Sequence, residues 1–280
     1  MSETSASATP ASIQLYRVRF TDSVPAGLRV LREFTDPCHC FAVMEPLASG
    51  LLPDAGRSGD EFYFLFLPGG SAVPYDLQKR GEEWMSPPDR PDAAPTVEIV
   101  MRSDRILWRP GRSLMQGAPD RMDEVLLALA DFSFYELELR RLEDEISADR
   151  ETVEKDAPLT TADMTSGSLA SLRHAADMAS NMTRRRLRFA RLEPRIEHPS
   201  ATLPPAARRL VSELLTQTEV LDRIEAVDDR LEVYEDLYEL ANDRLSEYRY
   251  WRSEALLEIG IVVILLVEVV LIIWEIAVVS

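Results

Sequence analysis

Apolar residues follow two different periods along the chain. Up to about residue 118 they alternate with polar residues or form short runs, which is typical of β-strands, and from Asp120 onward they recur at helical spacing. This change predicts an α+β fold, with an N-terminal α/β sandwich-like domain over residues 13–118 and long helices after it. The segments with strand character are Ile13–Phe20, Cys38–Met44, Phe62–Leu67, Ser71–Tyr75, Val97–Met101 and Arg105–Arg109.

The strand-like segments are not all of one kind. Phe62–Leu67 is apolar throughout, so we expect a strand that is buried on both faces of a sheet. Two other segments of the same domain have helical character instead. Pro25–Phe34 carries apolar residues three apart, and Asp76–Trp84 has no strand alternation, so each is predicted to form a short helix.

Heptad patterns dominate residues 119–253 and predict a coiled-coil-like bundle. The first helix is expected to begin at a capping Asp120 and to end at Ala157-Pro158. The second is expected to begin at the capping pair of Thr160 and Asp163 and to end near Pro194. The first helix repeats an apolar residue every seven positions, at Val125, Phe132, Leu139, Ile146 and Val153.

The third predicted helix, over residues 206–253, has the most regular heptads. One core position is apolar except at Gln217, and the other is apolar except at Glu213. These two positions predict packing within the bundle, or alternatively self-association of the chain. The first position holds Leu210, Ile224, Leu231, Tyr238 and Leu245, and the second holds Val220, Val227, Tyr234, Ala241 and Tyr248.

The two ends of the chain differ in character. Residues 1–12 are rich in Ser, Thr and Ala, and we expect a disordered tail there. Residues 255–279 are expected to form a C-terminal transmembrane helix, because Ile259–Val279 would be roughly 31 Å long as a helix and a bilayer core is about 30 Å thick. A buried apolar helix is the alternative, and the apolar character around the whole circumference disfavours it.

The expected topology is a single-pass, C-terminally anchored protein. Basic residues occur before the predicted span and none occurs after it, so the positive-inside rule places the bulk of the chain in the cytoplasm. The predicted location is the cell inner membrane, or the mitochondrial inner membrane in a eukaryote. The lipid bilayer is then one partner, and a homo-oligomer is expected.

Two acids fall inside the predicted span, and they are the candidate membrane-embedded polar residues. Glu268 and Glu275 are seven residues apart and share one helix face. A carboxylate at the centre of a bilayer costs at least about 2.5 kcal/mol. Either the two glutamates serve as an oligomer contact or a proton-sensing site, or they are protonated and merely tolerated.

Charge separates the predicted helices. Residues 120–156 hold 13 acids and 5 bases, residues 172–197 hold 3 acids and 7 bases, and residues 206–252 hold 12 acids and 7 bases. The basic helix can therefore pair with the acidic helices, or contact an anionic partner such as RNA or lipid headgroups. The candidate contact residues are Arg184, Arg185, Arg186, Arg188 and Arg191.

The overall composition argues against several classes of protein. Asp and Glu outnumber Lys and Arg by 48 to 31, so a net charge of −17 makes direct nucleic-acid binding an unfavoured function. Cys38-His39-Cys40 lacks a second pair of ligands, and a strand would point His39 away from the cysteines, so we expect no metal site there. No catalytic motif is found in the sequence, and neither an enzymatic activity nor a cofactor is expected.

Parts of the helical region resemble a known family. Thr218–Tyr234, Ala241–Leu245 and Glu268-Val269-Val270 resemble the YagE family, also called the required-for-meiotic-nuclear-division family, and Leu126–Glu145 is similar to one of its helices. The resemblance covers roughly residues 60–280. It implies an α/β N-terminal part, coil-forming helices and one membrane helix with an embedded Glu. It implies no known enzyme activity, and mitochondrial relatives are inner-membrane proteins that support translation.

Taken together, these expectations favour a non-enzymatic membrane-anchored scaffold or tether, which supports translation or envelope organisation through its cytoplasmic part. Its partners would then include a protein or a ribosomal component. The alternative function is an oligomeric channel or transport component built from the single membrane helix around Glu268.

Overall fold

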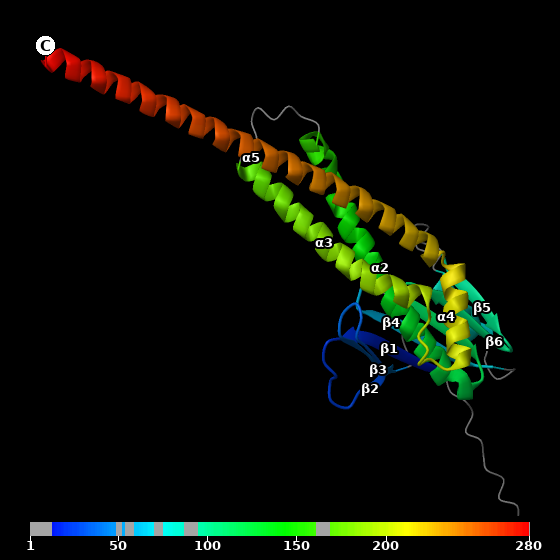
Figure 1. Cartoon of the computed structure of the whole chain (residues 1–280). Coiled ribbons are helices and arrows are strands. Elements are labelled where there is room, and N and C mark those ends of the chain that lie inside the picture. Colours follow the sequence, from blue (N-terminus) through cyan, green and yellow to red (C-terminus); the bar gives the residue numbers. More distant parts are fainter. Residues whose placement is uncertain are drawn as a thin grey trace, which may run out of the picture. The chain divides into compact units, whose positions relative to one another are not determined.

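The computed structural model describes residues 13–48, 52–53, 59–69, 75–86, 95–160 and 169–279 (Figure 1). The chain forms two compact units. The first contains Met1–Asp144 and Arg188–Val227, and the second contains Glu145–Leu187 and Asp228–Ser280. The predicted tail 1–12, most of the predicted strand Ser71–Tyr75 and the cap residue Asp163 lie outside the described residues.

The first unit is built on a seven-stranded sheet with the order β2-β3-β1-β4-β7-β6-β5. Neighbouring strands are antiparallel except β4 and β7, which run parallel and join two antiparallel groups. The α+β class predicted from the sequence is therefore correct. The strands are β1 (Gln14–Thr21), β2 (Arg29–Phe34), β3 (Cys40–Leu47), β4 (Glu61–Pro68), β5 (Val97–Met101), β6 (Asp104–Arg109) and β7 (Arg112–Gly117).

Both faces of the sheet are covered, as the apolar run in β4 predicts. Leu65 and Leu67 pack on one face with Trp84 of helix α1 (Tyr75–Met85). The opposite face meets the first half of helix α2 (Met122–Asp156), where Trp108 of β6 donates a hydrogen bond from Nε1 to Ser133 Oγ over 3.1 Å. The core of this unit therefore lies in two layers, one on each side of the sheet.

The predicted helix over Pro25–Phe34 is wrong, because Arg29–Phe34 forms strand β2 at the edge of the sheet. β2 pairs with β3 in an antiparallel register that shifts between Val30 and Arg32. Apolar residues three apart are compatible with a helix, but the ladder to β3 and the burial of Phe34 favour the extended form.

The hairpin between β5 and β6 closes with a residue in an uncommon conformation. Met101 pairs with Asp104, and Arg102 has φ 58° at the first position of the two-residue turn. Glycine is usual at this position of a type II′ turn. In the next turn, Gly111 has φ 77° at the second central position after Pro110, which is where a type II turn needs glycine.

We expect Arg102→Gly to raise the free energy of unfolding by up to about 1 kcal/mol. A left-handed φ costs a residue with a Cβ about 1–2 kcal/mol, and the greater freedom of glycine in the unfolded chain offsets part of that gain. Urea denaturation checks this, with Ser103→Gly as the control because φ of Ser103 is not positive. Equal destabilisation by both variants would show that the left-handed φ of Arg102 does not strain the turn.

The helices of the C-terminal half are interrupted at other residues than the sequence predicts. Helix α3 (Leu169–Glu197) continues through Pro194, where a break is predicted. The single third helix is divided into α4 (Pro205–Gln217) and α5 (Val220–Val279), and Glu219 between them has φ 53°. Short 3₁₀ turns, Pro119–Arg121 and Ala157–Thr160, lie at the two ends of α2, and Asp120 lies in the first of them.

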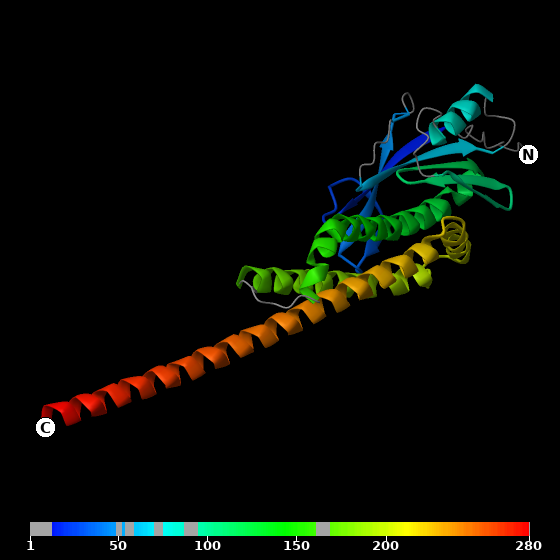
Figure 2. The same cartoon turned by 90° about the horizontal axis from the view of Figure 1, so that it is seen from above.

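The second unit packs α2, α3 and α5 together, as the heptads predict. Its core holds Val153, Met178, Met182 and Tyr238, with a residue from each helix. Figure 2 shows the backbone of α5 running beside α3. The buried Tyr238 donates its hydroxyl proton to Asp156 Oδ2 over 2.8 Å. Val153, Met182 and Tyr238 lie at apolar heptad positions of α2, α3 and α5, so each helix turns its heptad face toward the same core.

The predicted transmembrane helix over residues 255–279 is wrong. Within the part of the chain that the structure describes, no helix combines the length and the apolar character needed to cross a membrane.

Candidate functional site

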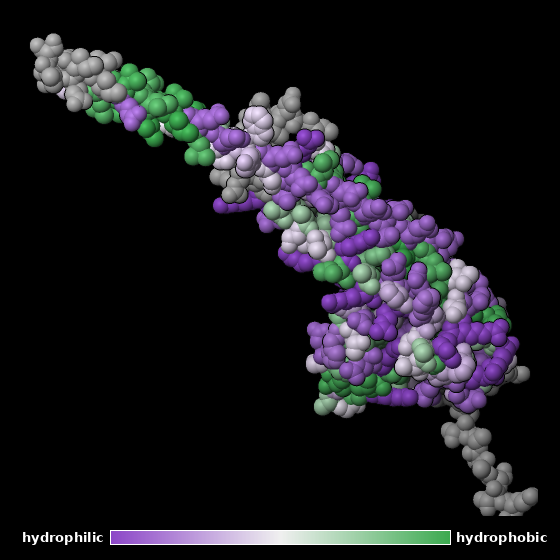
Figure 3. Space-filling view, viewed as in Figure 1, coloured by the Kyte–Doolittle hydropathy of each residue, from purple (hydrophilic) through white to green (hydrophobic). Residues whose placement is uncertain are grey.

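The apolar end of α5, Leu256–Trp274, is the largest exposed apolar surface among the described residues. Its described apolar side chains have exposed fractions between 52 and 70%. Figure 3 shows apolar atoms gathered along the visible face of this part of the chain. Because consecutive helical residues turn by about 100°, Ile261–Val267 cover the whole circumference of the helix. α5 continues here beyond the segments of α2 and α3 that pack on it (Figures 1 and 2). Thirteen large apolar residues contribute, namely Leu256, Leu257, Ile259, Ile261–Val267, Val269, Leu271 and Trp274.

The two candidate glutamates lie on this same part of α5. Glu268 is exposed in the middle of the apolar end, and Glu275 lies in the last turns of the helix, where the side chains are outside the described part. An exposed carboxylate is fully hydrated, so it carries no desolvation penalty of the kind expected in a bilayer.

Three of the five candidate arginines form an ion pair with an acid of their own unit. In the second unit, Arg185 pairs with Asp149 of α2, and Arg186 pairs with Asp228 of α5. In the first unit, Arg188 Nη2 lies 3.0 Å from Oε2 of the buried Glu138. The pairing of the basic helix with the acidic helices, one of the two alternatives left by the sequence, is therefore formed at these positions.

The other two arginines of the cluster are exposed. Arg184 is 3.3 Å from the hydroxyl of Ser180, one turn earlier in α3. Arg191 makes no hydrogen bond or ion pair to the described residues, but its charge helps to lower the pKa of Asp36, after the larger contribution of a hydrogen bond from Arg195. Of the five candidates, these two are the ones whose guanidinium is available for an anionic partner.

Two buried glutamates of α2 are held by arginines from several segments. Glu136 is paired with Arg140 of the same helix and with Arg223 of α5, whose Nη1 lies 3.2 Å away. Glu138 is paired with Arg141 and with Arg188. Charge-assisted pairs of this kind fix the positions of the helices, because leaving either partner unpaired would expose a buried charge to an apolar interior.

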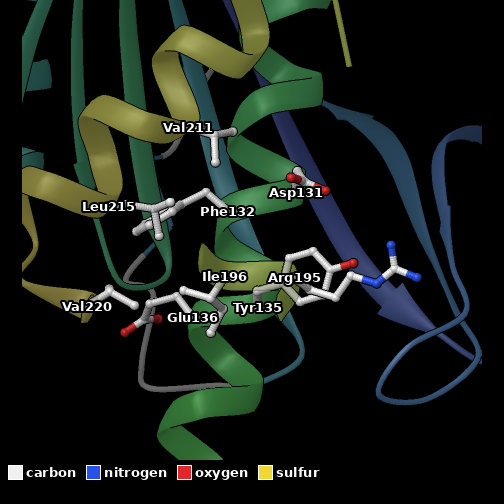
Figure 4. A pocket seen from close by; sticks show the side chains of 9 residues that line it. All are labelled: Asp131, Phe132, Tyr135, Glu136, Arg195, Ile196, Val211, Leu215 and Val220. Carbon is white, nitrogen blue, oxygen red and sulfur yellow. The ribbon is translucent and has the colours of Figure 1, made fainter. Parts of the chain in front are cut away.

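Asp131 differs from these glutamates, because its partner is imperfectly placed. Its side chain is 1% exposed, and Nε of Arg32 on β2 lies 2.9 Å from its Oδ1. That oxygen nevertheless accepts no hydrogen bond of good geometry within the described residues. Tyr135, Glu136 and Arg195 line the same small cavity (Figure 4). We call Asp131, Arg32, Tyr135 and Arg195 the Asp131 centre.

Burial raises the pKa of Asp131 to about 6, although Arg32 and then Arg195 act in the opposite direction. Burial also raises the pKa of Tyr135 to about 12. The cavity beside Asp131 has a volume of about 10 Å³, which is close to the space of one water molecule. The Asp131 centre can therefore hold or release a proton, but it has no room for an organic substrate.

Cys38 and His39 of the Cys38-His39-Cys40 segment precede β3, and Cys40 is its first residue. Cys38 is exposed and Cys40 is buried, and Nε2 of His39 lies 3.0 Å from Glu33 on β2. Burial raises the pKa of the Cys40 thiol to about 11, so this thiol stays protonated and is a poor nucleophile. Among the described residues, no group of three or more His, Cys, Asp or Glu side chains has an arrangement that could hold a metal ion.

Sequence reasoning overlooked the Asp131 centre, although one signal for it was present. Asp131 interrupts an otherwise apolar stretch of α2 between Val125 and Phe132. An acid within an apolar stretch of a helix either faces solvent or is buried beside a partner. The partner of Asp131 is Arg32, which lies about a hundred residues earlier in the sequence. Only the fold brings the two together.

The comparisons with known proteins leave the chain without a family. No family model matches it, and no curated protein matches it. The resemblance to the YagE family therefore stays an expectation.

Proposed function

We propose that this chain is a non-enzymatic scaffold that assembles with further copies of itself through the apolar end of α5. The exposed apolar surface of that helix is the observation that supports the proposal. Contiguous exposed patches of this kind are rare on monomeric proteins and usually mark an interface. The buried carboxylates of α2 support a structural role, because arginines hold Glu136 and Glu138.

The heptad register of α5 favours a second copy as the occupant. Leu231, Tyr238 and Ala241 occupy the core positions where α5 packs on its own chain, and all three are fully buried. The same positions continue in phase along the helix and become exposed in its apolar end. There they hold Ile259 and Leu266 at position a, and Val262 and Val269 at position d. Arg252 holds position a between the two stretches, so the apolar seam of this end begins at Ile259. An apolar seam at positions a and d is what identical parallel helices bury together.

The area available is sufficient for a stable contact. Burying most of the thirteen exposed side chains would remove on the order of 500–900 Å² of apolar surface per copy. A standard stable interface buries about 800 Å² per partner. A bundle of several copies covers more of the circumference of each helix than a dimer does, which suits a helix that is apolar all round.

The residue types at the core positions indicate the number of strands. β-branched residues at d together with Ile or Leu at a favour three or four strands over two. Glu268 and Glu275 fall two residues after the a positions, at position c, which faces water in a coiled coil. In this arrangement neither acid falls in the buried seam.

We expect the full chain to have a mass of three or four times 31.6 kDa in analytical ultracentrifugation, and Leu266→Asp to shift it to the monomer. An aspartate at position a would be buried without a partner in every strand. Val267→Asp is the matched control, because Val267 is the next residue, is 53% exposed and lies at position b outside the seam.

The outcomes of this experiment are distinct. Dissociation by Leu266→Asp with retention of the oligomer in Val267→Asp supports the seam. Equal dissociation by both substitutions would contradict the heptad register and indicate non-specific association of an apolar helix. A monomeric wild-type chain at micromolar concentration would overturn the proposal itself.

A further inference from the structure

An open depression lies beside the end of α3 in the first unit. It has a volume of about 610 Å³, within the range of sites for small organic ligands. The last turns of α3 form one side of it, the following residues up to Thr202 form another, and Asp36 lies at its edge. We call this feature the α3 depression, and Arg195 lines both it and the small cavity of the Asp131 centre.

The wall formed by α3 is basic. Arg191 and Arg195 are four residues apart in α3, so they project from the same side of the helix end, and His198 is the first residue after it. All three are exposed. Arg195 is oriented by Asp36, whose Oδ2 lies 2.7 Å from its Nη2, whereas Arg191 makes no such pair within the described part of the chain. Two guanidinium groups against one carboxylate leave the depression with a net positive charge, in a chain whose total charge is −17.

The residues that follow α3 offer hydroxyl groups to the depression. Ser200 and Thr202 lie 2.8 Å apart through their hydroxyl oxygens, and the backbone N–H of Thr202 points to Ser200 Oγ over 3.4 Å. Leu203, which follows them, is buried and donates its backbone N–H to the carbonyl of Ser200. The buried Leu203 therefore anchors the turn that presents the two hydroxyls.

We propose that the α3 depression binds a small organic phosphate monoester, with Arg191 and Arg195 as its charged ligands and the hydroxyls of Ser200 and Thr202 as further donors. Guanidinium groups match the geometry of phosphate oxygens and form two parallel hydrogen bonds to them. The volume leaves room for the organic part of a small metabolite beside the phosphate group. Arg191 is the principal ligand, since Asp36 already holds part of the guanidinium of Arg195.

The test uses the full chain and two probes, inorganic phosphate and glycerol 3-phosphate, in calorimetric titrations at low ionic strength. Saturable binding of one phosphate group per chain is expected, with the organic ester bound more tightly than the free ion. Arg191→Ala is expected to weaken binding of both probes at least tenfold. Arg208→Ala is the matched control, because Arg208 is an exposed arginine in α4 of the same unit and does not line the depression.

Each result decides the proposal. Tenfold weakening in Arg191→Ala with unchanged binding in Arg208→Ala supports it. Equal weakening in the two variants would show that the probes respond only to total charge, and this would overturn the site. Binding of inorganic phosphate alone would overturn the assignment to an organic ester, and absence of saturable binding would overturn the proposal as a whole. None of these outcomes depends on self-association through α5.

Discussion

Phe134→Ala is expected to lower the free energy of unfolding of the first unit by about 3–5 kcal/mol. The side chain is 1% exposed and lies where α2 meets the sheet. Its ring stacks on Phe34 of β2 at a centroid distance of 3.9 Å, and it lies 5.5 Å from the ring of Phe20 on β1. Truncation would remove these contacts and leave a cavity that rigid neighbours on two strands and one helix cannot fill.

Urea denaturation monitored by circular dichroism measures this loss. Val100→Ala is the control in the same unit, because Val100 lies on the edge strand β5 and is 65% exposed. We expect that control to change stability by less than about 0.5 kcal/mol. A cost below about 1 kcal/mol for Phe134→Ala would show that the aromatic cluster does not hold α2 against the sheet.

The sequence identified elements where the hydrophobic pattern alone decides the structure. Phe62–Leu67 is apolar at every position, and only a strand with two covered faces buries all of it. In α2, the apolar residue at every seventh position predicted a buried face of the helix, and Val153 of that face does lie in the helical core. Neighbouring strands decide the structure of β2 and β7. β7 has polar residues at several positions and was not expected, yet it forms because β4 and β6 both pair with it.

The arginine cluster illustrates why candidate sites were harder to predict. Arg184, Arg185 and Arg186 are consecutive in the sequence, but each residue of a helix turns by about 100°, so consecutive side chains face different neighbours. Arg185 therefore reaches α2 and Arg186 reaches α5. Arg191, which forms no ion pair within the described residues, lies beside Arg195, and the sequence had not grouped these two together.

The burial of the Asp131 centre gives the stability of the first unit a characteristic dependence on pH. The folded state raises the pKa of Asp131 from 3.8 to about 6, so between these values it holds a proton that the unfolded chain has released. Stability contributed by this group is therefore present at low pH and is lost as pH rises through about 6, by up to about 3 kcal/mol. Arg32 of β2 and Arg195 of α3 limit the loss, whereas Glu136 of α2 lines the same cavity and adds a further acid.

Arg32→Ala is consequently expected to destabilise the first unit by about 2–3 kcal/mol at pH 7.5. Asp131 then loses its nearest partner and must take up a proton to stay buried, which costs about 1.4 kcal/mol for each pH unit above its pKa of about 6. The cost should shrink as pH falls, since a protonated Asp131 needs no counter-ion. Urea midpoints measured between pH 4.5 and 7.5 check both statements.

The same substitution in an Asp131→Asn background separates the ion pair from the packing of Arg32. Arg32 also lies over the ring of Phe34 at 5.5 Å, and losing that contact should cost about 0.5–1 kcal/mol at every pH. In the Asp131→Asn background, Arg32→Ala is therefore expected to cost about that amount and to show no pH dependence. An equally large cost in both backgrounds would mean that Arg32 stabilises β2 through its packing, and that Asp131 is ionised without help from it.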